Sequence, residues 1–149
     1  MSYVSIIHGA RGLAYFGGNL AGCQNDRDAA LGWNWTFYDR VLRPVLAELG
    51  PDGPLFPALV APDNSLPVTI VGADDVEFLV RDTSDYLYVL AAKREGATVR
   101  VMFEDLPGSL AGTGDVLFEE PRQVSVADGS FTDWFGPNEV HVYRFAHQN

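Results

Sequence analysis

Apolar residues recur along this chain with two different periods. In the range 33–49 they recur every three or four residues, which predicts an amphipathic helix. The members of this stripe are Trp33, Phe37, Val41, Leu42, Val45, Leu46 and Leu49. Pro44 lies inside the stripe and should kink or divide the helix, because proline has no backbone N–H to donate. Gly50-Pro51 then ends it.

From Val68 onward the period changes to two, which predicts strands. The expected strands are 68–71, 76–82, 85–93, 97–104, 114–119, 122–127 and 139–145. Short segments rich in Gly, Pro, Asn and Asp separate them and indicate turns. Strands that recur at intervals of about 8–12 residues are typical of an antiparallel β-sandwich, Ig-like or jelly-roll-like, here with about seven or eight strands.

Two finer expectations follow from this pattern. The segments 85–93 and 97–104 should form a hairpin through Arg94–Gly96. Alternating apolar positions should mark the buried face of the strands: Val99, Val101, Phe103, Val140 and Val142. This assignment places His141 on the solvent face of the last strand.

The N-terminal fifty residues have a different character. Residues 2–8 fit a strand by their β-branched content, but Tyr3, Ile6 and Ile7 also fit the end of a helix, with Gly9 just past it. Residues 11–16 predict a short buried strand that stops at Gly17-Gly18, and residues 19–32 predict a long polar loop. Residues 51–67 hold five prolines and predict an extended connector. The expected organisation is therefore 1–50, a linker at 51–67, and a sandwich at 68–149.

Composition narrows the classes of function. The chain has 149 residues and a formal charge of −10, from ten basic and twenty acidic side chains. This charge argues against nucleic acid and against an anionic membrane surface as partners. Neutral ligands such as sugars remain compatible, although acidity can simply keep a protein soluble.

The cysteine and apolar content excludes further classes. Cys23 is the sole cysteine, which rules out an intrachain disulfide and a cysteine-based zinc cluster. No apolar run reaches the roughly 18 residues of a membrane span, and the N-terminus has no signal-peptide pattern. We expect no cofactor and no metal, and the cellular location stays open.

Taken together, these segments resemble the C-terminal end of a retaining glycoside hydrolase with a (β/α)8 barrel. The stretch HGARGLAYF is similar to the last barrel strand and the helix end before it. The stretch WNWTFYDRVLRPVLAELGP is similar to the last barrel helix. The stretches YLYVLAAKREGATVRVMFEDL and FTDWFGPNEVHVYRF are similar to the small antiparallel domain that often follows such barrels.

The resemblance also implies what this chain lacks. In that class the acid/base and nucleophile carboxylates lie at the ends of the fourth and seventh barrel strands, and both positions would precede Met1. A retaining mechanism needs two carboxyl groups about 5–5.5 Å apart. The chain should therefore not hydrolyse glycosides by that mechanism.

The resemblance points to a few candidate sugar-binding residues. In a complete barrel the loop 19–32 would border the sugar cleft. Polar groups there that suit sugar hydroxyls are Asn19, Gln24, Asn25 and Asp26. The alternative is a solvated loop that caps the helix. Trp33 belongs to the apolar stripe and is expected in the core, whereas Trp35 lies off the stripe and is the better ring for stacking on a sugar.

Other candidates are weaker. Trp134 either stacks on a ligand or, as its position next to Phe135 favours, forms a buried aromatic plug at one end of the sandwich. Asp26-Arg27-Asp28 and Asp74-Asp75 lack the spacing of a calcium loop. Glu119-Glu120 are expected at a solvated edge. No G-x-S-x-G motif supports nucleophilic catalysis.

Three hypotheses of function follow. The chain is a non-catalytic accessory region of a carbohydrate-active enzyme, structural or weakly sugar-binding. Alternatively, it is a small glycoside hydrolase, glucanase- or xylanase-like, whose Asp and Glu carboxylates assemble on the sandwich or between chains. The third hypothesis is a protein-interaction module. Because the barrel-like segment 1–50 would expose apolar side chains, we also expect a homo-oligomer that forms through it.

Overall fold

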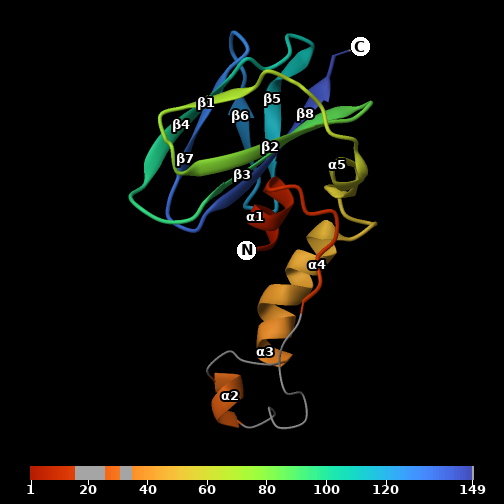
Figure 1. Cartoon of the computed structure of the whole chain (residues 1–149), viewed down its shortest axis with the longest axis vertical. Coiled ribbons are helices and arrows are strands. Elements are labelled where there is room, and N and C mark those ends of the chain that lie inside the picture. The colour runs from red at the N-terminus through yellow and green to blue at the C-terminus, as the bar shows by residue number, and fades with distance from the viewer. Residues whose placement is uncertain (16–25, 31–34, 149) are drawn as a thin grey trace. The chain divides into compact units, whose positions relative to one another are not determined.

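The computed structural model describes residues 1–15, 26–30 and 35–148. The chain divides into two compact units, one made of Met1–Arg11 with Val60–Asn149 and the other of Gly12–Leu59. The first unit holds the strands and the N-terminal helix (Figure 1). The second holds the remaining helices, including α5 except for its last residue, Val60.

The first unit is an antiparallel β-sandwich. One sheet has three strands in the order β1-β4-β7, and the other has five in the order β2-β3-β8-β5-β6. Within the described residues there are eight strands: β1 Thr69–Val71, β2 Val76–Asp82, β3 Tyr86–Lys93, β4 Val99–Glu104, β5 Leu110–Leu117, β6 Arg122–Ser125, β7 Phe131–Phe135 and β8 Val140–His147. The expected mainly-β sandwich with an N-terminal helix is confirmed.

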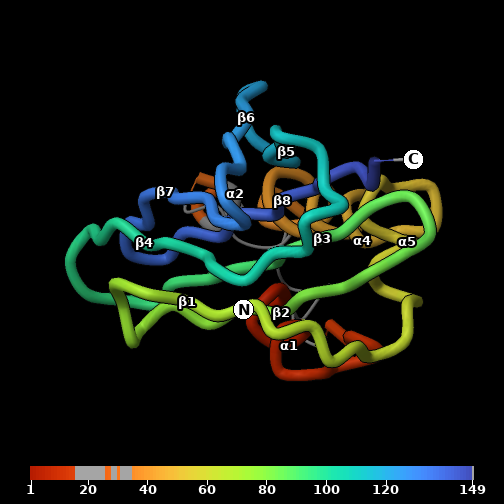
Figure 2. Tube along the Cα trace, turned by 90° about the horizontal axis from the view of Figure 1, so that it is seen from above, coloured from red at the N-terminus to blue at the C-terminus, as the bar shows by residue number. Residues whose placement is uncertain are grey.

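The expected hairpin between β3 and β4 is wrong. β3 pairs with β2 and β8 in the five-stranded sheet, whereas β4 pairs with β1 and β7 in the other. The connection after β3, with Gly96 at φ 92°, carries the chain from one layer to the other (Figure 2). The strand β7 is an addition to the expected strands, and it contains Trp134 and Phe135, the two residues expected to form a plug at one end of the sandwich.

Aromatic rings fill the space between the sheets. Phe103 is fully buried and stacks on Phe131, with ring centroids 4.6 Å apart and planes 9° from parallel. Tyr143 and Phe145 of β8 join the same cluster. The core-facing residues of β8 are therefore the odd-numbered ones, and His141 is 7% exposed rather than on the solvent face. The alternation of Val140 and Val142 predicted the wrong core face because β8 is a central strand that is buried on both faces. Val142 is therefore buried as well as His141.

The N-terminal helix α1, Ser2–Ile7, packs on β2 and β3 and buries Ile6 and Ile7. Gly9 has φ 92° and ends the helix as expected. Its N–H donates to the carbonyl of Ile6, and the N–H of Ala10 donates to the carbonyl of Ser5, which is the Schellman pattern. His8 adds a 2.9 Å contact to Glu77 of β2.

The strand expected at 11–16 is not formed over 11–15, the part of it that the structure describes. A strand needs a hydrogen-bonding neighbour, and none of the described strands pairs with this segment. Arg11 instead donates to the carbonyl of Ala61 and to Asp63, which also pairs with Arg81 of β2.

The second unit contains the predicted long helix. The long helix comprises α3 Trp35–Phe37, the π-helical η1 Tyr38–Leu42 and α4 Arg43–Leu49. A separate short helix, α2 Asp26–Ala30, precedes it in the chain. Residues 35–49 are helical throughout, and Pro44 is accommodated because the turn before it widens, with the N–H of Arg43 donating to the carbonyl of Tyr38. The connector at 51–67 is not wholly extended, because α5, Phe56–Val60, forms there with Pro57 in its first turn.

Gly114 of β5 predicts a clear stability effect. A Cβ at this position would lie 2.2 Å from Cε1 of Phe145, whose ring is fully buried in the packed core. We therefore expect Gly114→Ala to lower the free energy of unfolding by about 1–3 kcal/mol in urea denaturation. Gly112→Ala in the same strand is the matched control, because its Cβ would meet nothing within 4 Å. Equal stability of the two variants would contradict the prediction.

Candidate functional site

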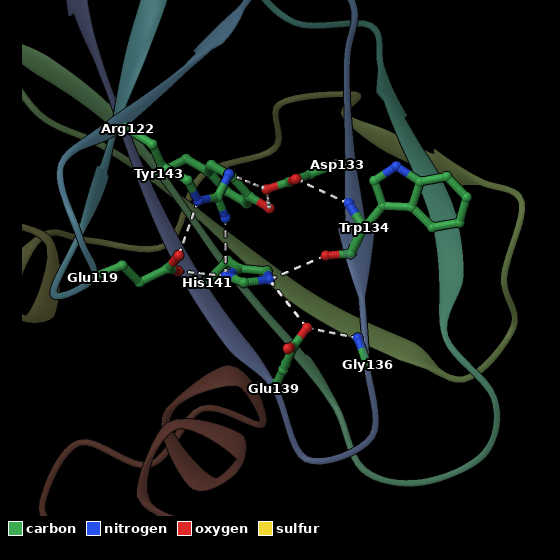
Figure 3. Close-up of polar contacts among 8 residues, drawn as sticks. All are labelled: Glu119, Arg122, Asp133, Trp134, Gly136, Glu139, His141 and Tyr143. Carbon is green, nitrogen blue, oxygen red and sulfur yellow. Dashed lines mark hydrogen bonds and ion pairs between the residues drawn. The ribbon is translucent and has the colours of Figure 1, made fainter.

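Charged side chains gather where β6, an edge strand of the five-stranded sheet, lies next to β7 of the three-stranded sheet (Figure 3). Glu119 comes from the turn between β5 and β6, and Arg122 begins β6. Asp133 belongs to β7, while His141 and Tyr143 belong to β8. The group therefore joins residues of both sheets, and we call these five residues the edge cluster.

Asp133 is the centre of the edge cluster. Its Oδ2 accepts hydrogen bonds from Nη1 of Arg122 at 2.7 Å and from the hydroxyl of Tyr143 at 2.9 Å. Its Oδ1 accepts the backbone N–H of Trp134 at 2.9 Å. The Asp133 side chain is 14% exposed, so this carboxylate finds its partners in the protein rather than in water.

His141 bridges the cluster to the next turn. Its Nδ1 contacts Glu119 and lies 3.2 Å from Nη2 of Arg122, while its Nε2 lies 3.1 Å from the carbonyl oxygen of Trp134. Its ring packs against Phe135, with centroids 4.6 Å apart. His141 therefore joins Glu119, Arg122 and the backbone of β7.

Glu139 closes the turn between β7 and β8. Its Oε2 accepts the backbone N–H of Gly136 at 2.6 Å and lies 3.6 Å from Nε2 of His141. Pro137 follows Gly136, and Asn138 has φ 63°, which suits the third position of a type II turn. The turn after Trp134 is therefore held by side chains as well as by the backbone.

Two pKa shifts describe the electrostatics of the edge cluster. Burial, followed by the nearby carboxylate of Asp133, raises the pKa of Tyr143 well above its ordinary value, so the hydroxyl keeps its proton and donates. Burial acts to lower the pKa of Arg122, but its hydrogen bonds to Asp133 and Glu119 outweigh that effect and raise it. The cluster therefore keeps one cation between two carboxylates.

The ring of Trp134 points away from the edge cluster, toward the outside of the sandwich (Figure 3). Its neighbours Asp133 and Phe135 face the interior, and the indole lies on the outer face of the three-stranded sheet, 59% exposed (Figure 3). Both of its backbone polar groups are engaged, the N–H by Asp133 and the carbonyl by His141. Arg100 of β4 lies opposite it in the register and donates to Thr132, which shares the outer face.

The carboxylates of the edge cluster and of Glu139 find their hydrogen-bond partners within the protein. Glu119 and Asp133 both receive hydrogen bonds from Arg122, and Glu139 holds its own turn. The carboxylates thus serve as internal partners for cations and N–H groups. Among the described residues, no group of three or more His, Cys, Asp and Glu side chains is arranged to hold a metal ion.

Of the sequence-predicted sugar-binding residues, the structure describes Asp26, Trp35 and Trp134. Asn19, Gln24, Asn25 and Trp33 lie outside the described residues. Asp26 begins α2 and is exposed, and Trp35 begins α3, is 49% exposed and meets Tyr38 edge to face. The expectation that Trp134 forms a buried plug is wrong, because its side chain is 59% exposed and only its neighbour Phe135 is buried.

The edge cluster itself was missed. Glu119, which is expected at a solvated edge, has a side chain that is only 26% exposed and that contacts His141 and Arg122. The sequence does hold a sign of this burial: His141, Tyr143 and Phe145 alternate along the last strand and therefore share one face. The large rings of Tyr143 and Phe145 mark that face as the core better than the smaller valines mark the other.

Within the described residues, no helix has the length and hydropathy needed to cross a bilayer. No family model matches the chain, and no curated protein matches it. Among solved structures, the chain is similar to the X-ray structure of Xyn30A, a glycoside hydrolase family 30 subfamily 8 xylanase from Clostridium acetobutylicum. The TM-score is 0.41 at 11% identity, over 56% of this chain and 25% of the xylanase chain. A likeness at this level carries no argument about function.

Proposed function

We propose that the sandwich is a non-catalytic carbohydrate-binding module, of the kind that accompanies a carbohydrate-active enzyme, and that it binds a neutral sugar chain on Trp134. The observation that carries this proposal is the exposed indole on a strand whose backbone is fixed at that residue on both sides. An aromatic ring held in this way offers a flat apolar face for a pyranose without a large loss of conformational entropy on binding.

The neighbours of Trp134 support the same proposal. Arg100 and Thr132 lie beside the ring on the outer face of the sheet and supply hydrogen-bond donors and an acceptor for sugar hydroxyls. The net charge of −10 does not oppose a neutral ligand. The internal partners of Glu119, Asp133 and Glu139 favour a binding module over the alternative of a small glycoside hydrolase.

We expect Trp134→Ala to abolish most of the binding. Stacking on the indole should be worth about 1.5–3 kcal/mol, because it removes apolar area from water, and this corresponds to a roughly ten- to hundredfold rise in Kd. The measurement is affinity gel electrophoresis with soluble xylan and β-glucan, followed by calorimetry on the glycan that binds. Trp35→Ala is the matched control, because it removes another exposed tryptophan, 49% against 59% exposed.

Three outcomes would contradict the proposal. The first is wild-type binding by Trp134→Ala. The second is dependence of binding on Trp35 instead, which would favour the helix over the sheet face. The third is hydrolysis of the polysaccharide that is lost in Glu119→Gln or Glu139→Gln, which would favour the hydrolase alternative.

A further inference from the structure

The outer face of the three-stranded sheet continues beyond Trp134. Along each strand, outward side chains alternate with side chains that face the core. Phe131 of β7, Phe103 of β4 and Ile70 of β1 face the core. The residues of opposite parity near Trp134 are Thr132 of β7, Arg100 and Met102 of β4, and Val71 of β1, which is 46% exposed. We call these four residues and Trp134 the outer platform.

The register of the three strands arranges the outer platform in two rows. Trp134 lies opposite Arg100 in one row, and Thr132, Met102 and Val71 form the next. Because neighbouring strands are about 4.8 Å apart, β1 lies about 10 Å from β7. The platform is therefore wider than one pyranose ring. A ligand that stacks on Trp134 and also reaches Val71 needs several sugar residues.

Arg100 differs from the other described lysine and arginine side chains of the first unit. Each of the others forms an ion pair with a carboxylate: Arg11 and Arg81 with Asp63, Lys93 with Asp75, Arg94 with Glu77, Arg122 with Asp133, and Arg144 with Asp115. Among the described residues, the partner of Arg100 is instead the neutral hydroxyl of Thr132, at 3.2 Å. Arg100 is also exposed. Its guanidinium group is thus oriented by Thr132 and retains N–H donors for a ligand.

We propose that the outer platform binds an internal stretch of a neutral polysaccharide, about three sugar residues long, that crosses the strands from Trp134 to Val71. This inference rests on the function proposed above. One sugar stacks on Trp134, the next accepts hydrogen bonds from Arg100, and the third lies on Met102 and Val71. A neutral chain fits better than a polyanion because the protein carries a formal charge of −10. A guanidinium group can donate to neutral hydroxyls as well as to carboxylates.

The first test varies the length of the ligand. The full chain is titrated by calorimetry with oligosaccharides, from the monosaccharide to the hexasaccharide, of the polysaccharide that it binds. Affinity should rise at least roughly tenfold from the monosaccharide to the trisaccharide and then level off, because further residues lie beyond the platform. A wild type that binds no polysaccharide contradicts the proposed function and this inference with it. Binding that requires Trp134 but is equally tight for monosaccharide and trisaccharide overturns this inference alone.

The second test removes the far end of the outer platform. Val71→Ser should weaken trisaccharide binding roughly three- to tenfold and leave monosaccharide binding unchanged, because only the longer ligand reaches β1. Unchanged monosaccharide binding also shows that the variant is folded. Val60→Ser is the matched control, because Val60 is 62% exposed at the end of α5, outside the sheet. Trisaccharide binding that is unchanged in Val71→Ser, or weakened equally in Val60→Ser, would overturn the crossing direction.

The third test asks what Arg100 recognises. Arg100→Gln and Arg100→Lys should both weaken trisaccharide binding roughly tenfold, because lysine keeps the charge but lacks the planar fork of donors. Binding should be the same at low and high salt, because the ligand is neutral. Wild-type binding by Arg100→Gln would remove Arg100 from the platform. Full rescue by Arg100→Lys together with weaker binding at high salt would show that the ligand is anionic, which contradicts the neutral assignment.

Discussion

Phe103→Ala is expected to lower the free energy of unfolding by about 3–5 kcal/mol. The Phe103 ring is fully buried, is stacked on Phe131, and lies 5.8–6.4 Å from the rings of Phe78, Phe135 and Tyr143. Its removal leaves a cavity bounded by rigid rings from both sheets, which cannot collapse to fill it. Urea denaturation followed by fluorescence and far-UV circular dichroism measures the loss.

Phe118→Ala is the control for this prediction. Phe118 follows β5 in the turn to β6 and is 38% exposed, so its truncation should cost less than about 1 kcal/mol. Both residues lose the same atoms, and the difference between the two variants isolates the effect of the core. If Phe118→Ala were as destabilising as Phe103→Ala, the centre of the core would lie elsewhere.

Asp133→Ala is expected to cost about 3 kcal/mol of stability, at the lower end of the range for breaking a buried ion pair, because the Asp133 side chain is 14% exposed and that of Arg122 is 34% exposed. The change leaves the Tyr143 hydroxyl and one side of the Arg122 guanidinium without their acceptor. Arg122 retains Glu119, which limits the loss. Denaturation at neutral pH measures it, with Asp133→Asn expected to be intermediate because the amide oxygen can still accept.

Asp115→Ala is the matched control for Asp133→Ala. Asp115 also accepts hydrogen bonds from an arginine and a second side chain, Arg144 and Gln123, but it is 44% exposed. Water can replace those partners, so the expected cost is about 0–1 kcal/mol. A similar cost at both aspartates would mean that the edge cluster does not join the two sheets.

The edge cluster is linked by hydrogen bonds to Trp134, the residue proposed to bind sugar. Asp133 and His141 fix the backbone of Trp134 from the inner side of β7, and the indole projects from the outer side. A change at Asp133 that leaves the protein folded should therefore weaken glycan binding through Trp134 without touching the ligand.

Local pattern was enough to predict much of the fold. The period-two segments between Val68 and Phe145 predicted most of the strands, because alternation of apolar side chains is a property of each strand taken alone. Gly9 marked the end of α1, and the three- and four-residue spacing marked the helix of residues 35–49. These features depend on backbone preferences and on neighbours within a few residues.

The partners of each strand and the direction of each side chain were decided only by the tertiary structure. β3 and β4 are separated by a short turn, yet they lie in different sheets. His141 is buried because β8 is central and apolar on both faces, so alternation could not tell its two faces apart. Arg122, Asp133 and His141 lie far apart along β6, β7 and β8 and meet only where the sheets close, since an ion pair between strands depends on how the strands are stacked and not on local sequence.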